Sequence, residues 1–179
     1  MINGAQLHLA VNHLPVVSVL IGFLVLLVGT ILKNEIVKKT ALAILVFAAI
    51  TVAPAYLSGE EAEELVEHKP GVTKALIHDH EESAELSLVF TALTGGVAAL
   101  ALFLGRKRNG ELAKKTAVGA LGLSGVTFAL LANTAHLGGM IRHDEIRPAS
   151  GAGAVEGKVA TQGENHSEKK AGESEDHDD

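Results

Sequence analysis

The sequence predicts an all-α fold, a four-helix transmembrane bundle built from two tandem αα-hairpins. Three observations lead to this prediction: four long uncharged apolar runs, two short basic loops, and an octapeptide that occurs twice in similar form. Of the 179 residues, 47% are hydrophobic, only 3% are aromatic, and 19 are glycine. This composition is more apolar and richer in glycine than that of typical soluble domains, so it favours the membrane class.

The four runs that lack Asp, Glu, Lys and Arg cover residues 14–32, 40–57, 86–104 and 116–141. Each is close to the roughly 20 residues that a helix needs to cross a hydrocarbon core of about 30 Å. The first run does not resemble a signal peptide, because no Lys or Arg precedes it and no small-x-small cleavage site follows it before Lys33. We therefore expect a transmembrane domain over 1–148, with a polar helical connection over 58–83.

The loops differ in charge, and this difference predicts the orientation. Residues 33–39 carry three lysines and residues 106–115 carry five Lys or Arg, whereas residues 58–83 carry two lysines against eight acids. Under the positive-inside rule the two basic loops are cytoplasmic. Both termini and the acidic connection are then expected on the periplasmic side of a bacterial inner membrane.

The octapeptides are "EIVKKTAL" at 35–42 and "ELAKKTAV" at 111–118, which are offset by 76 residues. Each of them joins one predicted span to the next, so the match predicts a duplicated αα-hairpin. Residues 149–179 differ from the rest of the chain: from Glu156 onward there are eight acids and three lysines. We expect this tail to be disordered, because it has too little apolar surface to bury.

Several functional classes can be set aside from residue content alone. The chain has no cysteine, which excludes disulfides, thiolate zinc sites, iron–sulfur clusters and covalently attached c-type haem. Its formal charge of −6 does not suggest binding to nucleic acid. No Ser/His/Asp nucleophile or phosphate loop can be read, so the sequence leaves open whether the protein is an enzyme.

Histidines and carboxylates are predicted to meet in one layer at the periplasmic end. Counting 20 or 21 residues along each span from its cytoplasmic cation reaches His13, Glu60, Glu85 and His136. Ionisable groups at this depth usually face the bundle interior, where helical bundles hold metal ions. Their mixed nitrogen and oxygen donors would suit iron, zinc, manganese or copper. An outer shell of possible ligands is formed by His8, Glu64, His78, Glu82, Met140 and His143.

The predicted function is redox chemistry or metal handling within a membrane complex or a homo-oligomer, in contact with membrane lipid. One alternative is electron transfer by a b-type haem, with His13 and His136 as axial ligands. The nearby carboxylates would repel the haem propionates, and few aromatic residues are present to line a porphyrin pocket. The second alternative is a structural or sensory membrane subunit without a cofactor.

One segment carries a family resemblance. "LHLAVNHLPVV" at 7–17 resembles the opening of a bacterial membrane family catalogued as domain of unknown function 2231, with His8, His13 and Pro15 at matching positions. Leu14 stands where that family usually has Phe. The segments "SGEEAEE", "HDHEE" and "HLGGMIRH" are similar to its other His/Glu-bearing parts, so the resemblance extends over most of the chain up to Pro148. It implies a four-helix membrane protein, sometimes associated with redox or haem, without a settled activity.

Overall fold

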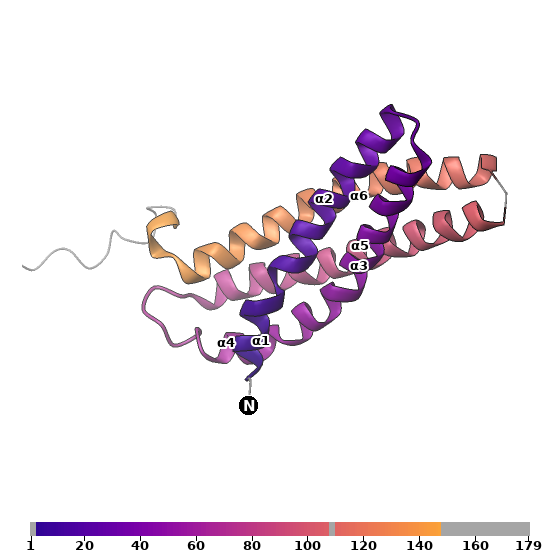
Figure 1. Cartoon of the computed structure of the whole chain (residues 1–179). Coiled ribbons are helices and arrows are strands. Elements are labelled where there is room, and N and C mark those ends of the chain that lie inside the picture. The colour runs from indigo at the N-terminus through magenta and orange to yellow at the C-terminus, as the bar shows by residue number, and fades with distance from the viewer. Residues whose placement is uncertain (1–2, 108–109, 148–179) are drawn as a thin grey trace, which may run out of the picture. The chain divides into compact units, whose positions relative to one another are not determined.

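The computed structural model describes residues 3–107 and 110–147, and in these ranges the chain forms helices and no strand (Figure 1). The elements are α1 (Gly4–Val11), α2 (His13–Ile31), α3 (Glu35–Leu57), α4 (Gly59–Glu64), α5 (Lys74–Arg106), α6 (Gly110–Arg142) and the 3-10 helix η1 (Asp144–Ile146). The acidic tail predicted for 149–179 lies outside the described residues.

Four helical segments are long and apolar enough to cross a membrane, which confirms the predicted number. They cover Gly4–Ile31, Glu35–Leu57, Lys74–Arg106 and Gly110–Arg142. The third is longer than its predicted span, because α5 takes up residues 74–83 of the expected connection over 58–83. Thr73 caps α5 by accepting a hydrogen bond from the Leu76 N–H at 3.2 Å. No proline or glycine follows before Gly95, so nothing interrupts the helix.

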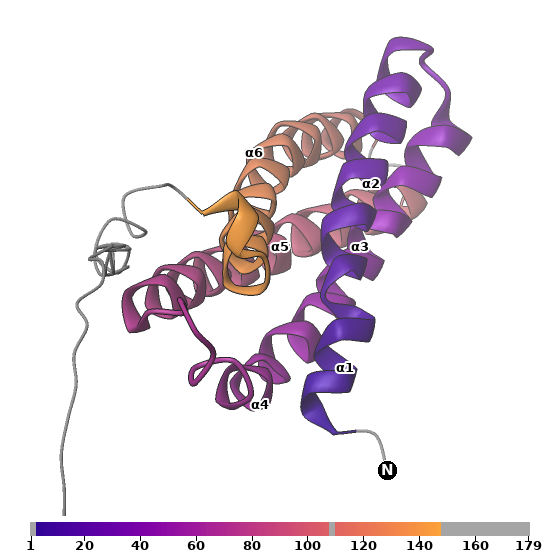
Figure 2. The same ribbon diagram turned by 90° about the vertical axis from the view of Figure 1, so that its left-hand side faces the viewer.

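The helices form a closed ring, in which α2 packs along α3, α3 against α5, α5 along α6, and α6 against α2 (Figures 1 and 2). The last residues of α2 and α5 and the first residues of α3 and α6 lie at one end. We call this the basic end, because it carries Lys33, Lys38, Lys39, Arg106, Lys107, Lys114 and Lys115. The opposite end, which we call the acidic end, is formed by α1, α4, residues 65–73 and η1.

The interior of the ring is built from small residues around a few large ones. Its main apolar cluster contains Leu26, Ala41, Leu42, Leu45, Ala98, Ala101, Ala117 and Ala120. Small residues let helix backbones approach closely, which is how membrane helices gain packing energy where lipid supplies no hydrophobic drive. The outward faces carry aliphatic side chains such as Ile31, Ile50 and Val118, which are 68%, 66% and 58% exposed. Such faces are suited to contact with lipid.

Candidate functional site

The short helix α1 is attached to the acidic end by two side chains. Asn3 caps α1, and the Glu61 carboxylate of α4 accepts a hydrogen bond from the Gly4 N–H at 2.6 Å. The half-buried His8 ring donates from Nδ1 to the Ala55 carbonyl of α3, at 2.9 Å. These contacts hold α1 against both α3 and α4.

A second histidine joins α5 to α6. His80 Nδ1 lies 3.1 Å from the backbone oxygen of Thr134 and donates to it. Gly138, one turn further along α6, makes room for this ring, since a Cβ there would lie 3.0 Å from His80 Cε1. The imidazole therefore fills a gap that a side chain at 138 would close.

A row of hydroxyl groups continues from His80 into the bundle along the contact between α5 and α6. The hydroxyls of Ser83 and Ser87 each lie 2.8 Å from Thr134 Oγ1, and those of Thr94 and Thr127 lie 2.7 Å apart. We call this set the hydroxyl row; it comprises Ser83, Ser87, Thr91, Thr94, Ser124, Thr127 and Thr134. Beyond Thr94 the same interface is lined by the alanines of the apolar cluster. The row therefore stops inside the bundle and gives no polar path from end to end in the described residues.

Two carboxyl groups share a hydrogen bond at the acidic end, Glu63 of α4 and Glu81 of α5. This bond, partial burial and the negative charges of Glu81, Glu67 and Glu60 raise the pKa of Glu63 from 4.5 to about 7. Two carboxylates that share a site repel each other when both are ionised, so Glu63 keeps its proton at pH values where an isolated carboxyl group has lost it. Below about pH 7 the proton on Glu63 thus joins α4 to α5.

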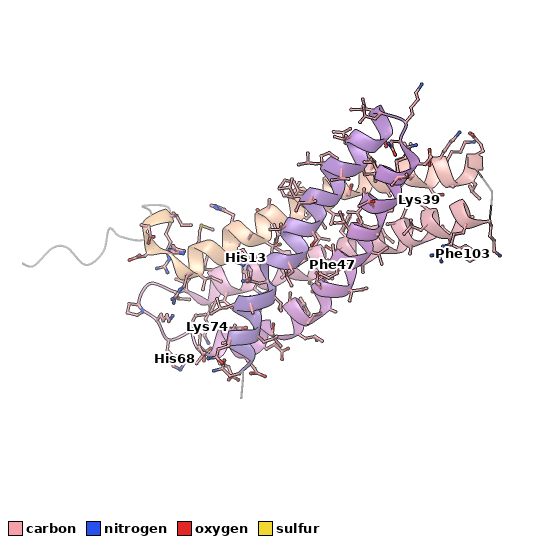
Figure 3. The ribbon with its side chains drawn as sticks, viewed as in Figure 1. His13, Lys39, Phe47, His68, Lys74 and Phe103 are labelled. Atoms are coloured by element: carbon pink, nitrogen blue, oxygen red, sulfur yellow. The ribbon has the colours of Figure 1, made fainter. Side chains whose placement is uncertain are left out.

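The four predicted core ligands, by contrast, are not brought together. His13, Glu60, Glu85 and His136 are all exposed. The reason is the position of these residues around their helices. On α2, His13 lies nine residues from the buried Gly22. In the same way Glu85 lies nine residues from the buried Thr94 on α5, and His136 lies nine residues from the buried Thr127 on α6. Nine residues are about two and a half turns, so these side chains point away from the bundle. His13 instead contacts the neighbouring Asn12 side chain, and Figure 3 labels it on α2.

The predicted outer shell is likewise dispersed over the acidic end. Glu64, His78, Glu82 and His143 are exposed, and only His8 and Met140 are partly buried. His143 Nδ1 lies 3.0 Å from the Glu145 carboxylate, an exposed pair outside the ring of helices. Arg147 Nε donates to the Met140 carbonyl at 2.7 Å, so it is the backbone of Met140 that is engaged there.

This arrangement does not fit a metal centre or a haem held by the predicted residues. Within 3–107 and 110–147, no group of three or more His, Cys, Asp or Glu side chains lies close enough to hold a metal ion. His13 and His136 face outward from α2 and α6, whereas axial ligands of one haem must face each other. The metal and haem interpretations remain predictions from the sequence.

The ionisable side chains that the structure brings into contact between helices include His8, Glu61, Glu63, His80 and Glu81. Of these, only His8 is among the ligands predicted from the sequence. His80 could have been found from its helical phase, because it lies seven residues before the buried Ser87 and so on the same face of α5. Helical phase does not identify Glu63, because its partner Glu81 is brought near by the non-helical residues 65–73.

The chain was compared with protein families, with curated proteins and with solved structures. The resemblance to domain of unknown function 2231 stays a prediction, which these comparisons neither support nor oppose. No family model, no curated protein and no solved structure matches this chain.

Proposed function

We propose that this protein is a multi-pass membrane protein whose acidic end responds to protons, a sensory or structural subunit that works without a cofactor. The observation that carries the proposal is the hydrogen-bonded carboxyl pair Glu63–Glu81 between α4 and α5, in which the pKa of Glu63 is raised to about 7. This interpretation corresponds to the cofactor-free alternative drawn from the sequence.

The other contacts between helices at the acidic end support this proposal. Titratable side chains join α1 to α3 through His8, α1 to α4 through Glu61, and α5 to α6 through His80. The position of α1, α4 and residues 65–73 therefore depends on groups that can change charge. Such an arrangement is suited to converting pH into a change in helix packing.

The direction of the response follows from the pKa of Glu63. A carboxyl group whose pKa is raised by folding stabilises the folded arrangement most below its ordinary pKa of 4.5. That contribution is lost as pH rises through the folded value of about 7. Above this pH Glu63 is ionised, and its repulsion by Glu81 favours separation of α4 from α5.

The first prediction is that the segment 59–73 loses protection from amide hydrogen exchange as pH rises from 6 to 8, after correction for the intrinsic exchange rate. Glu63→Gln should remove this pH dependence, because an amide does not titrate and can still donate a hydrogen bond to Glu81. Hydrogen exchange with mass spectrometry on the full chain in lipid nanodiscs measures both.

The matched control is Glu64→Gln, which removes the neighbouring exposed carboxyl group. It should keep the pH response of the native chain. A flat pH profile in the native chain, or equal effects of the two variants, would contradict a proton shared at Glu63.

The metal and haem interpretations can be tested on the same preparation. An absorption spectrum with a Soret band would support haem, and elemental analysis would detect a stoichiometric metal ion. If either group is present and is lost in His136→Ala, the sequence prediction regains support and the cofactor-free proposal fails.

The second prediction concerns orientation, for which we propose a cytoplasmic basic end. The chain has no cysteine, so a single introduced thiol can be labelled without background. In intact cells a membrane-impermeant maleimide should label His68→Cys at the acidic end and should leave Gly110→Cys at the basic end unlabelled until the membrane is permeabilised. The reverse pattern would overturn this orientation.

A further inference from the structure

A groove of about 450 Å³ lies between α3 and α5 at the basic end. Its wall on α3 is formed by Lys39, Ala43 and Val46, which are spaced four and three residues apart and so share one helix face. Its wall on α5 is formed by Ala99, Leu102, Phe103 and Arg106. Figure 3 labels Lys39 and Phe103, one from each wall.

The chemistry of the groove changes along its length. Lys39 and Arg106 supply positive charge where the helices reach the basic end, and the rest of the lining is aliphatic or aromatic. The exposed side chains Ala43 and Ala99 are small, which leaves the space open. One part of the groove therefore suits an anion and the adjoining part suits a hydrocarbon chain.

The two cations in the lining have no carboxylate partner among the described residues. The ion pairs at the basic end use other groups: Lys38 with Glu35 at 2.8 Å, and Lys115 with Glu111 at 3.7 Å. Lys107 adds a third cation nearby, with its Nζ 4.7 Å from the centre of the Phe103 ring. The lining thus presents unneutralised positive charge beside an apolar wall.

We infer that this groove binds one anionic glycerophospholipid, with its phosphate at Lys39 and Arg106 and an acyl chain along Ala43, Val46, Ala99 and Leu102. Both helices are long and apolar enough to cross a membrane, so the groove faces lipid wherever the protein is inserted. Basic pockets between spanning helices recognise acidic lipid head groups in this way. The inference does not depend on the proton response at the acidic end.

A second groove gives a useful contrast. It measures about 580 Å³, is lined by α5 alone, and contains only apolar residues such as Leu93 and Val97. Any acyl chain could cover it, and nothing in its lining would select a charged head group. Selectivity for an anionic lipid is therefore expected only at the groove that contains Lys39 and Arg106.

The test uses the full chain in detergent, incubated with equal amounts of phosphatidylglycerol and phosphatidylcholine and examined by native mass spectrometry. We expect one retained phosphatidylglycerol per chain. Each cation near a membrane surface changes the affinity for an anionic lipid by about fivefold, so Lys39→Gln with Arg106→Gln should lower retention at least tenfold. Should the double variant fail to fold, Lys39→Gln alone carries the same test at about fivefold.

Two further variants separate a lipid site from general charge attraction. Ala99→Phe fills the groove without changing charge and should reduce retention as strongly as loss of the cations. Lys33→Gln with Lys114→Gln removes the same charge from the same end but outside the groove, and should leave retention unchanged. Excess inorganic phosphate should not displace the lipid, because it cannot use the apolar wall.

Four results would overturn the inference. They are equal retention of the two lipids, native binding by Ala99→Phe, equal loss in the Lys33 and Lys114 control, and displacement by free phosphate.

Discussion

Replacing Gly95 with valine is expected to destabilise the bundle by about 3 kcal/mol, near the upper end of the usual cost of overpacking. Gly95 lies on α5 where it packs against α3, and an added Cβ would overlap the Cβ of Ala49 and lie 3.3 Å from the Leu45 carbonyl oxygen. Neither atom is the end of a flexible side chain, so the two helices would have to move apart. The midpoint of unfolding in detergent, followed by circular dichroism, measures the effect.

The neighbouring Gly96 provides the control. No atom lies within 4 Å of a Cβ built at that position. Gly96→Val should therefore change the free energy of unfolding by no more than about 0.5 kcal/mol, as is usual for exposed positions. Equal destabilisation by the two variants would show that α5 and α3 do not pack closely at Gly95.

Leu45→Ala is expected to cost about 2–5 kcal/mol of unfolding free energy, the range found when a large buried side chain is truncated. Leu45 is fully buried in α3, within the apolar cluster of the ring. Its Cδ2 atom lies 2.6 Å from the position of a Cβ added to Gly22 of α2, so it fills the space that this glycine leaves. Ile50→Ala on the same helix is the control, because Ile50 is 66% exposed.

The same geometry predicts that substitutions at Gly22 and Leu45 are energetically coupled. Gly22→Ala alone should be destabilising, because its Cβ meets Leu45. In the Leu45→Ala background the added methyl group should occupy part of the cavity and recover stability, with a coupling of about 0.5–3 kcal/mol. Strict additivity in the double-mutant cycle would show that Leu45 does not contact α2.

The number of spanning helices could be predicted because it depends on a local property, the length of uncharged apolar runs. The start of α3 is also local: Asn34 Oδ1 accepts hydrogen bonds from the N–H groups of Ile36 and Val37 and caps the helix. The continuity of α5 from Lys74 into the apolar span was not predicted, because hydropathy ends a span at the first charged residue. A polar segment such as 74–85 can continue the same helix beyond the apolar run.

The helix face on which each candidate residue lies could not be predicted in the same way, because counting residues along a span gives depth but not direction. His136 and Thr134 are at almost the same depth, yet Thr134 faces α5 and His136 faces outward. The spacing of small and hydroxyl residues on α6, at 117, 120, 124, 127 and 134, marks the inward face and could have supplied that direction. The Glu63–Glu81 pair could not have been found in this way, since it depends on the path of residues 65–73.

The hydroxyl row also affects how easily α5 can slide along α6. Each of its four threonine hydroxyls also lies within hydrogen-bond distance of a backbone oxygen of its own helix, to which it can donate instead: Thr91 to Ser87, Thr94 to Phe90, Thr127 to Leu123 and Thr134 to Leu130. If α5 shifted along α6, every threonine hydroxyl would therefore still have an acceptor. Hydrogen bonds of this kind in a membrane resist such a shift only weakly. His80 has no such second acceptor among the described residues, and its bond to the Thr134 carbonyl fixes one relative position of the two helices. The imidazole therefore resists a shift of α5 along α6 in a way that the threonine hydroxyls do not.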